Sequence, residues 1–258
     1  MRFSDKVDQR NQEVCVKPYY ERDGVTIYHG DCLEVLRALP SRIDAVVTDP
    51  PFAFAGGASN GRASPPDAQF FEHWLGSVFV VLHAATRPES AWMLWCDWRS
   101  AASYDRVLVR SAADGYDARR VSQVLVHDRQ MGGLGSPFRN QTDWIALVRG
   151  PRTDFRERVP KTTPNIFRSY WYYGKHDNHP SEKDPAVGAQ LAQWISDPGD
   201  MVLDPFCGSG SILMGCRSVG RSAIGIEREE RYCEIAAKRL SQEVLPLFPR
   251  AIIGSKGR

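Results

Sequence analysis

The segment VLDPFCGSGS, from Val202 to Ser211, constrains the fold of this chain more than any other part of the sequence. Its pattern indicates a short apolar strand that ends in an acid, a glycine-rich turn and the start of a helix at about Ser209. Gly208 and Gly210 carry no Cβ atom, so the backbone can turn sharply there and approach a ligand closely. In open α/β sheets, ligands bind at such turns, outside the carboxyl ends of the strands. The segment therefore predicts an α/β sheet with a ligand site at one edge.

The apolar pattern of the remaining chain agrees with this fold class. Short apolar runs alternate with stretches of helical spacing from Gly24 to Arg149, and the alternation restarts at Pro185 and continues to Leu240. It predicts a Rossmann-like, mostly parallel sheet with helices on both faces. The expected strands are 25–28, 43–48, 91–96, 121–126, 144–148, 201–203 and 223–226, and the expected helices are 32–39, 70–85, 100–113, 185–195, 209–219 and 229–240.

A segment of different composition separates the two α/β stretches. Residues 150–178 are rich in basic and aromatic side chains and show neither helical nor strand periodicity. We therefore expect one domain interrupted by an irregular insertion. Its first half would span 24–149, the insertion 150–178 and its second half 179–245.

Composition excludes several classes of protein. The chain has 258 residues and a net charge of +2, which argues against a polybasic arm but leaves room for a local basic patch. No run of about 18 apolar residues occurs, so we expect no transmembrane span. The six cysteines lack zinc-site spacing. Reduced cysteines in a cytoplasmic protein without a metal site are the natural interpretation.

A second chemical signal is AVVTDPPF, from Ala45 to Phe52. Its two prolines remove N–H donors and leave carbonyl acceptors free. Asp49 adds a carboxylate acceptor, and Phe52 offers a flat face for stacking. Together these groups predict a pocket that accepts hydrogens from a planar amino group and stacks on its ring.

A third signal is the acid Glu227, which closes the next expected strand about twenty residues after the glycine-rich turn. An acid in that place suits the two hydroxyls of a ribose. The turn itself is not GxGxxG, so a dinucleotide is not the expected ligand.

These motifs resemble those of the amino DNA methyltransferases that use S-adenosylmethionine. DPPF at 49–52 resembles their catalytic motif and DPFCGSGS at 204–211 their cofactor loop, while HGDCLEVL at 29–36 and HPSEK at 179–183 resemble two further motifs. The catalytic motif precedes the insertion and the cofactor loop follows it, which is the permuted order of the family's beta class. The resemblance covers most of residues 25–240. One departure is that Asp184 separates Lys183 from Pro185, where family members usually have Lys-Pro.

The resemblance implies a role for each motif. Asp49, Pro50, Pro51 and Phe52 would form the catalytic site around the target base. Asp31 would accept hydrogens from the adenine of the cofactor. The residues expected to bind S-adenosylmethionine are Asp31, Cys32, Asp49, His179, Ser181, Lys183, Asp204, Pro205, Phe206, Gly208, Ser209, Gly210 and Glu227, with Glu227 at the ribose and the three residues from the 179–183 motif at the methionine end.

The expected reaction is methyl transfer to an exocyclic amine in double-stranded DNA. Accepting both amine hydrogens stabilises the positive charge that grows as the nitrogen attacks. The base must leave the duplex to reach the pocket. N6 of adenine is favoured, because related enzymes specific for N4 of cytosine more often carry Ser where Asp49 stands. The alternatives are N4 of cytosine, an amine in RNA or protein, and a catalytically silent DNA-binding subunit.

The insertion is expected to recognise DNA. Its basic residues alternate with aromatic ones, which suits phosphate and base contacts and wedging between bases. A solvated loop pinned by buried aromatics is the alternative. Two glycine-containing loops, 53–69 and 131–140, would also face DNA. The expected DNA-binding residues are Arg139, Arg152, Arg156, Lys161, Arg168 and Lys175.

Three further expectations concern packing and partners. Trp92, Trp95 and Trp98 surround an apolar strand and are expected to be buried. The histidines show no metal spacing and are expected in packing or surface roles. By resemblance, the chain would form a homodimer and act beside a cognate restriction endonuclease on another chain.

Overall fold

A computed structural model describes residues 16–39, 43–51, 68–130, 137–155, 158–168 and 182–242. In these ranges the predicted strands and helices are all present, with bounds that differ from the prediction by up to five residues. The strands are β1 (Tyr20–Arg22), β2 (Val25–His29), β3 (Ile43–Thr48), β4 (Thr86–Cys96), β5 (Arg120–Asp128), β6 (Thr142–Arg149), β7 (Ile166–Arg168), β8 (Met201–Asp204) and β9 (Ser222–Glu227). The helices are α1 (Cys32–Ala38), α2 (Ala68–Ala85), α3 (Trp98–Ala113), α4 (Pro185–Ile195), α5 (Ser211–Ser218) and α6 (Glu230–Ser241).

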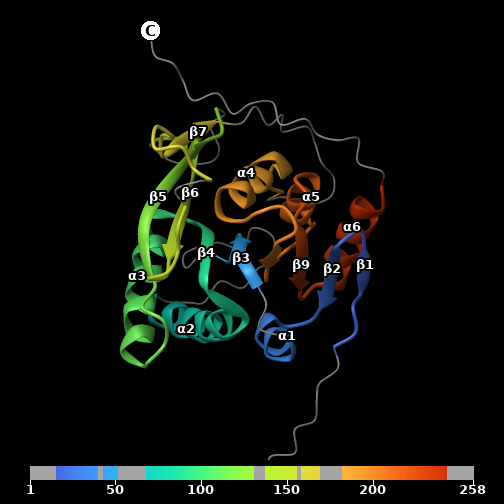
Figure 1. The fold of residues 1–258 in the computed structure, drawn as a ribbon, viewed down its shortest axis with the longest axis horizontal. Helices are drawn as coiled ribbons and strands as arrows, with labels where there is room; N and C mark the ends of the chain where they lie inside the picture. Colours follow the sequence, from blue (N-terminus) through green and yellow to red (C-terminus); the bar gives the residue numbers. More distant parts are fainter. Residues whose placement is uncertain are drawn as a thin grey trace, which may run out of the picture.

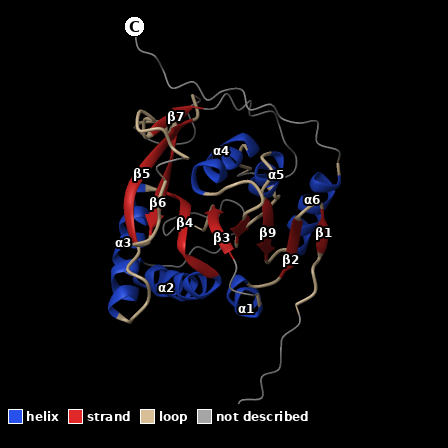
Figure 2. Cartoon of the chain, in the orientation of Figure 1, coloured by secondary structure: helices blue, strands red, loops and turns tan. Residues whose placement is uncertain are grey.

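The strands form a single sheet in the order β1-β2-β9-β8-β3-β4-β6-β5-β7, with helices on both of its faces (Figures 1 and 2). Strands β2, β9, β8, β3 and β4 run parallel, and β6 runs antiparallel between β4 and β5. The predicted Rossmann-like class is thereby confirmed. Two edge strands of three residues each, β1 and β7, were not predicted, because both are largely exposed and carry no apolar run.

The register of the sheet brings several strand ends to one edge. Thr48 pairs with Leu94 across β3 and β4, while Cys96 of β4 and Val126 of β5 both pair with Trp144 of β6. The carboxyl ends of β3, β4, β5 and β8 therefore lie along the same edge of the sheet. We call it the carboxyl edge.

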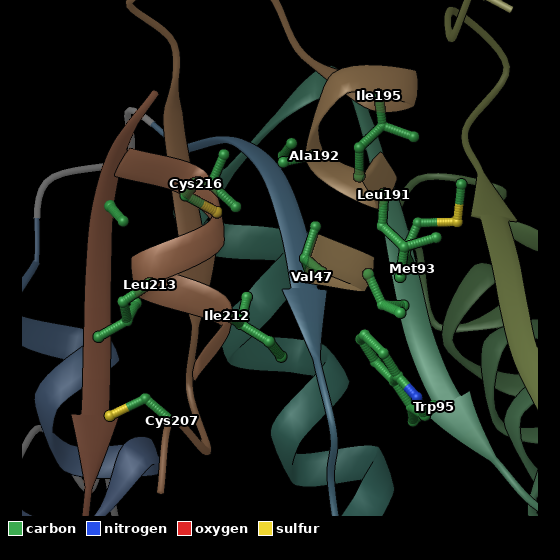
Figure 3. Packing of buried hydrophobic residues seen from close by; sticks show 14 of the residues in the cluster. Val47, Met93, Trp95, Leu191, Ala192, Ile195, Cys207, Ile212, Leu213 and Cys216 are labelled. Carbon is green, nitrogen blue, oxygen red and sulfur yellow. The ribbon is translucent and has the colours of Figure 1, made fainter. Parts of the chain in front are cut away.

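The two faces of the sheet bury separate apolar clusters. Helices α1, α2 and α3 cover one face, and α4, α5 and α6 cover the other (Figure 1). Strand β4 shows the alternation, since Trp92 packs on the first face and Trp95 on the second, both almost fully buried. Figure 3 shows Trp95 in the second cluster beside Met93 and Leu191. The prediction that Trp98 is buried is wrong: it is the first residue of α3 and is 64% exposed.

Helices α4 and α5 approach each other unusually closely at two glycines. A Cβ atom on Gly215 of α5 would lie 2.3 Å from the Pro185 carbonyl oxygen at the start of α4, and one on Gly188 would lie 3.1 Å from the Ile212 Cα atom. Only glycine permits this approach. As a result, the start of α4 lies beside the middle of α5, and Gly188 in α4 lies beside the first turn of α5.

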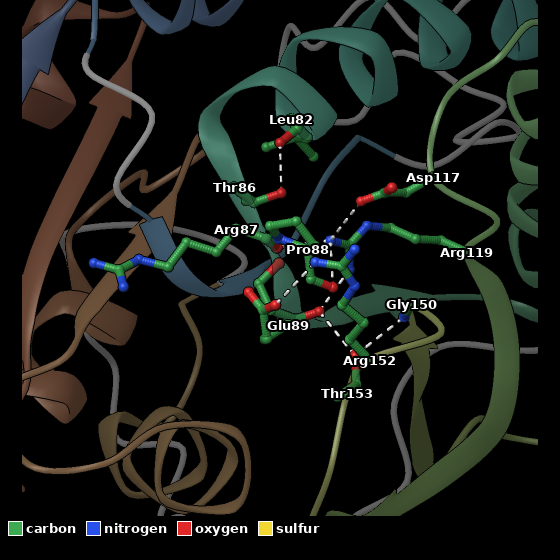
Figure 4. A network of polar contacts seen from close by, with 11 residues as sticks. Leu82, Thr86, Arg87, Pro88, Glu89, Asp117, Arg119, Gly150, Arg152 and Thr153 are labelled. Atoms are coloured by element: carbon green, nitrogen blue, oxygen red, sulfur yellow. Dashed lines mark hydrogen bonds and ion pairs between the residues drawn. The ribbon is translucent and has the colours of Figure 1, made fainter.

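At the opposite edge of the sheet, the buried guanidinium of Arg119 holds the start of β4 (Figure 4). It donates to the Ser90 carbonyl at 2.5 Å, to the Arg87 carbonyl at 2.8 Å and to the Pro88 carbonyl at 3.4 Å. It also lies 4.8 Å above the Trp92 ring. These contacts satisfy carbonyl groups that no neighbouring strand pairs. No described helix is long and apolar enough to cross a membrane.

Candidate active site

Asp204, at the end of β8, lies at the buried centre of the carboxyl edge and is 1% exposed. Its Oδ1 accepts hydrogen bonds from the Thr48 hydroxyl at 2.6 Å and from the Phe206 amide at 3.2 Å. Its Oδ2 is buried without a hydrogen-bond partner. Burial, together with the negative charges of Asp49 and Glu227, raises the pKa of this carboxyl to about 7, against the two hydrogen bonds that lower it. The sequence predicted an acid at the end of this strand, and Asp204 lies there, directly before the glycine-rich turn.

The glycine-rich turn adopts the conformation that its glycines suggested. Gly208 and Gly210 have φ values of +50° and +79°, both in the left-handed region. Helix α5 begins two residues later than expected, at Ser211, with Gly210 as its N-cap. The Gly208 amide donates to Glu227 Oε2 at 3.0 Å, and the Glu229 amide donates to Oε1 at 2.8 Å. The turn and the acid are thus brought together.

Cys207 fills space between the glycine-rich turn and β9. It is 6% exposed, and its Sγ would lie only 2.8 Å from a Cβ atom on Gly225. Burial raises the pKa of its thiol well above the ordinary value, which disfavours the nucleophilic thiolate.

Asp49 directly follows β3, and the two oxygens of its carboxylate have different surroundings. Oδ2 lies 3.1 Å from the Lys183 Nζ, and Oδ1 is buried without a hydrogen-bond partner. The Lys183 ammonium also lies 5.9 Å from the centroid of the Trp95 ring. Asp184 accounts for the departure from the family motif, because its side chain accepts a hydrogen bond from the Ala186 amide at 2.8 Å and caps α4.

Glu182 is a site residue that the sequence analysis did not identify. Its side chain is 7% exposed, and Oε1 pairs with Arg239 of α6 at 2.5 Å. The Arg239 guanidinium also donates to the Ser209 carbonyl at 2.7 Å and to the Ser211 hydroxyl at 3.1 Å. Glu182 Oε2 is buried without a hydrogen-bond partner. No sequence spacing links residue 182 to residue 239, so only the fold could reveal this pair.

Two pockets adjoin at Lys183, which lines both of them. The first encloses about 360 Å³, part of it open to solvent, and the second about 270 Å³. The first pocket is lined by Asp49, Glu182, Lys183, Asp204, Phe206, Cys207, Gly208, Ser209, Ser211 and Ile212. The second pocket is lined by Trp95, His127, Arg129, Asp143, Lys183, Asp184 and Val187.

The second pocket contains a buried histidine and a half-buried acid. His127 Nδ1 lies 3.4 Å from Asp143 Oδ2, and the His127 ring stacks on Phe167 with 5.1 Å between centroids. Burial acts to raise the pKa of Asp143. The hydrogen bond with His127 and the charges of Lys183 and Arg129 outweigh it, so the pKa is lowered. Asp143 is therefore a negatively charged group in the pocket lining, with the positive charges of Lys183 and Arg129 near it.

The other predicted cofactor residues lie at the end of β2. Asp31 caps α1 by accepting from the Leu33 amide at 2.8 Å, and Cys32 is buried in that helix. His29 pairs with Glu227 in the register of β2 and β9. Asp31 and Cys32 thus follow the strand next to Glu227, and neither lines the two pockets. His179, Ser181 and Phe52 lie outside the described residues.

The predicted DNA-binding residues are divided between the two edges of the sheet. Arg139 precedes β6 at the carboxyl edge, and Arg168 ends β7 at the same edge, 3.0 Å from Asp128. Arg152 lies at the opposite edge, 3.6 Å from Glu89 (Figure 4). Lys161 is exposed in the segment before β7. Arg156 and Lys175 lie outside the described residues, as do most of loops 53–69 and 131–140.

The aromatic residues of the insertion that the structure describes pack inward. Phe167 is 5% exposed and contacts Trp194 edge-on, with 5.3 Å between ring centroids. Phe155 packs on the same apolar cluster, beneath the Arg149 guanidinium. For these two rings the structure agrees with the alternative of aromatics that pin the segment by packing inward, because Phe167 is buried and Phe155 is half-buried against the same cluster.

Comparison with known proteins identifies the family. The family described as DNA methylase, N6_N4_Mtase, matches residues 43–238, the region that contains both pockets. The chain belongs to this family. It is accordingly an amino-DNA methyltransferase that uses S-adenosylmethionine and acts on N6 of adenine or N4 of cytosine.

Individual relatives span nearly the whole chain. The type II methyltransferase M.ScaI of Streptomyces caespitosus is 26% identical over 273 aligned positions, covering 90% of this chain and 86% of that protein. The DNA adenine methyltransferase YhdJ of Escherichia coli K12 is 23% identical, with coverages of 88% and 86%. Among solved structures, the PvuII DNA methyltransferase (cytosine-N4-specific) has a TM-score of 0.70 at 18% identity, with coverages of 88% and 89%. The complex of M1.HpyAVI with SAM has a TM-score of 0.63 at 21% identity, with coverages of 83% and 99%.

Proposed function

We propose that this chain methylates the exocyclic N6 of adenine in double-stranded DNA. In this proposal the first pocket holds S-adenosylmethionine, and the second holds the ring of the flipped base. One observation carries the proposal: the two pockets meet at the Asp49–Lys183 ion pair, beside a buried Asp49 oxygen that has no hydrogen-bond partner. An acceptor in that position faces the point where an amine and a methyl donor must meet.

The first pocket fits S-adenosylmethionine. Asp49, Glu182 and Asp204 line it, and each has one buried carboxylate oxygen without a hydrogen-bond partner. A cationic ligand stabilises such oxygens, because buried charges are costly unless they are paired. S-adenosylmethionine supplies a sulfonium-bound methyl group and carries an ammonium group as well. A Cβ atom on Gly208 would meet nothing within 4 Å, so open space adjoins the turn, where the chain of the cofactor can approach the backbone.

Glu227 is proposed to bind the ribose of the cofactor. Each of its two oxygens accepts one backbone amide, which fixes the carboxylate against the turn. A carboxylate has about four acceptor sites, so each oxygen keeps one for a hydroxyl group. Asp31 and Cys32, after the neighbouring strand, are then proposed to contact the adenine ring.

The two oxygens of Asp49 are proposed to have separate tasks. Lys183 holds Oδ2 and fixes the orientation of the carboxylate, while Oδ1 accepts a hydrogen from the target amine together with the Pro50 carbonyl. The amine is a poor nucleophile, because its lone pair is delocalised into the ring. Fixed acceptors favour the pyramidal, positively charged nitrogen of the transition state over the planar ground state.

The second pocket is proposed to receive the base, which must leave the duplex to reach it. Trp95 and His127 give it flat walls, and Asp143 and Arg129 offer an acceptor and a donor. Phe52 would add a stacking face. Arg139 and Arg168, at the carboxyl edge, are proposed to contact the DNA backbone. On composition alone we propose the same for Arg152, Arg156, Lys161 and Lys175, with residues 150–178 as the target-recognition segment.

The choice of adenine rests on Asp49. Related cytosine enzymes more often carry Ser at this position, although the amine edges of the two bases are alike. The named relatives include both kinds, one called an adenine methyltransferase and one cytosine-N4-specific. On the resemblance alone, we also propose a homodimer that acts beside a cognate restriction endonuclease on another chain.

Nucleoside mass spectrometry of unmethylated genomic DNA, incubated with the protein and S-adenosylmethionine, tests the proposal. N6-methyladenine is the expected product. N4-methylcytosine would overturn the choice of base but keep the reaction class. No modified nucleoside, with cofactor binding verified, would overturn the proposal in favour of another polymer or a silent subunit.

Substitution of Asp49 tests the division of roles. Asp49→Ala should abolish methylation and leave binding of S-adenosylhomocysteine largely intact, because the expected loss is confined to the amine acceptor. Loss of that binding in a variant that keeps its circular dichroism spectrum would contradict the assignment.

A further inference from the structure

Glu182 lies where the chain enters α4, at the rim of the first pocket. Its side chain is only 7% exposed, yet only Oε1 has a partner, the Arg239 guanidinium. Oε2 is buried without a hydrogen-bond partner. A buried carboxylate that is satisfied on one side only indicates a ligand group on the other side.

The Arg239 guanidinium is held on the side of the glycine-rich turn. One of its nitrogens, Nη1, donates to the carbonyl and the hydroxyl of Ser209 at 2.7 and 2.9 Å, and to the Ser211 hydroxyl at 3.1 Å. The other, Nη2, holds Glu182 Oε1. This arrangement fixes the Glu182 carboxylate in one orientation, and it leaves Oε2 as the acceptor that the turn does not use.

We propose that Glu182 is a cofactor-binding residue whose Oε2 receives the α-ammonium group of the methionine moiety of S-adenosylmethionine. The inference rests on the proposed function, since it assumes that the first pocket holds this cofactor. Of the two cationic groups of the cofactor, only the ammonium has N–H donors, so only the ammonium can satisfy a carboxylate oxygen by hydrogen bonding.

The neighbouring side chains support this assignment. Lys183, the next residue, holds the catalytic Asp49, and Glu227 is tied to the Gly208 amide on the other side of the turn. Two adjacent residues thus divide two tasks. Glu182 is directed to the amine of the cofactor, and Lys183 is directed to the acceptor of the target amine.

The test measures dissociation constants by titration calorimetry for S-adenosylhomocysteine and for its deamino analogue, which keeps the carboxylate but lacks the ammonium. Both ligands are measured on the full-length wild type and on Glu182→Gln, which removes the charge but retains an oxygen for Arg239. Glu234→Gln, at an exposed position of α6, is the matched control for the change in net charge. A charged hydrogen bond of this kind predicts that Glu182→Gln weakens S-adenosylhomocysteine on the order of tenfold to a hundredfold.

The deamino analogue separates a contact from a structural role. It should bind wild type and Glu182→Gln within about twofold of each other. An equal loss for both ligands would overturn the inference, because it would place the effect in the Arg239 network. No loss for either ligand would overturn it as well. Failure of the wild type to bind S-adenosylhomocysteine or S-adenosylmethionine at all would instead overturn the proposed function.

If Glu182→Gln fails to fold, the wild type alone decides. Removal of the ammonium from the ligand should then weaken its binding by the tenfold to hundredfold given above. Equal affinities of the wild type for the two ligands would overturn the inference.

Discussion

Asp204→Asn should change the pH dependence of stability in a direction set by the burial of this carboxyl. The pKa of Asp204 is raised from 3.8 to about 7 in the folded protein. The folded state therefore holds the proton more tightly than the unfolded state does. The stability that Asp204 contributes is fully present below about pH 4 and is lost as the pH rises through about 7.

The magnitude follows from the two pKa values. A change from 3.8 to about 7 corresponds to about 4 kcal/mol between the low- and high-pH limits, at roughly 1.4 kcal/mol per pH unit. Between pH 5 and pH 8 the wild type should lose about 2–3 kcal/mol of unfolding free energy through this group alone. Asparagine does not titrate, so between pH 5 and pH 8 the unfolding free energy of Asp204→Asn should fall less than that of the wild type, by the same amount of about 2–3 kcal/mol.

Urea denaturation of the ligand-free protein at pH 5, 6, 7 and 8, followed by circular dichroism, measures the difference. Comparing the two pH profiles removes the constant cost of a buried amide at the Oδ2 position. It also removes the titration of every other group. Asp114→Asn is the control, because Asp114 is exposed after α3 and undergoes the same change of charge. Parallel profiles for wild type and Asp204→Asn would refute the reasoning, since they would mean that Asp204 ionises in the fold as it does in water.

Two further substitutions test the backbone and the edge of the sheet. Gly210→Ala should lower the free energy of unfolding by about 1–3 kcal/mol, because φ is +79° and the new Cβ would lie 2.9 Å from that of Ala236. The control is Gly220→Ala, where φ is +75° and nothing lies within 4 Å, so this variant should show only the smaller cost of about 1 kcal/mol for the backbone conformation. Equal losses in thermal or urea unfolding would contradict the role of the contact. Arg119→Met should lower it by about 2–4 kcal/mol, because the Ser90 and Arg87 carbonyls lose their donor, and Arg120→Met, at an exposed neighbouring position, should have a much smaller effect in the same assay.

Much of the fold was readable from the sequence because its signals are local. Strand β3 is mostly apolar and almost wholly buried, and the turn at residues 205–210 needs glycines at particular positions. The edge strand β7 gave no such signal, since only Phe167 of its three residues is buried. Trp98 was misassigned for a related reason: it lies two residues beyond the end of β4, where the chain has already turned into α3 and the side chain faces solvent.

The site was predictable in its motifs but not in its pairings. Asp49, Asp204 and Glu227 stand at strand ends, so the topology of a parallel sheet already places them at one edge. The partner of each charge depends on contacts between segments far apart in sequence. Lys183 lies 134 residues after Asp49 in the sequence but pairs with it in the fold. Glu182 meets Arg239 because both lie beside the glycine-rich turn, where Arg239 also donates to Ser209. Sequence spacing carries no information on such contacts.

The acids of the first pocket lower the stability of the ligand-free protein, and the same acids would favour binding of a cationic ligand. Asp204, Asp49 and Glu182 each keep a buried oxygen without a partner, and each such oxygen destabilises the fold. A neutral ligand would leave that cost in place. A ligand with cationic groups beside these oxygens removes part of it, and the energy recovered adds to the affinity. The unsatisfied carboxylates therefore favour a ligand that carries positive charge, which is the property that the proposed function requires of the first pocket.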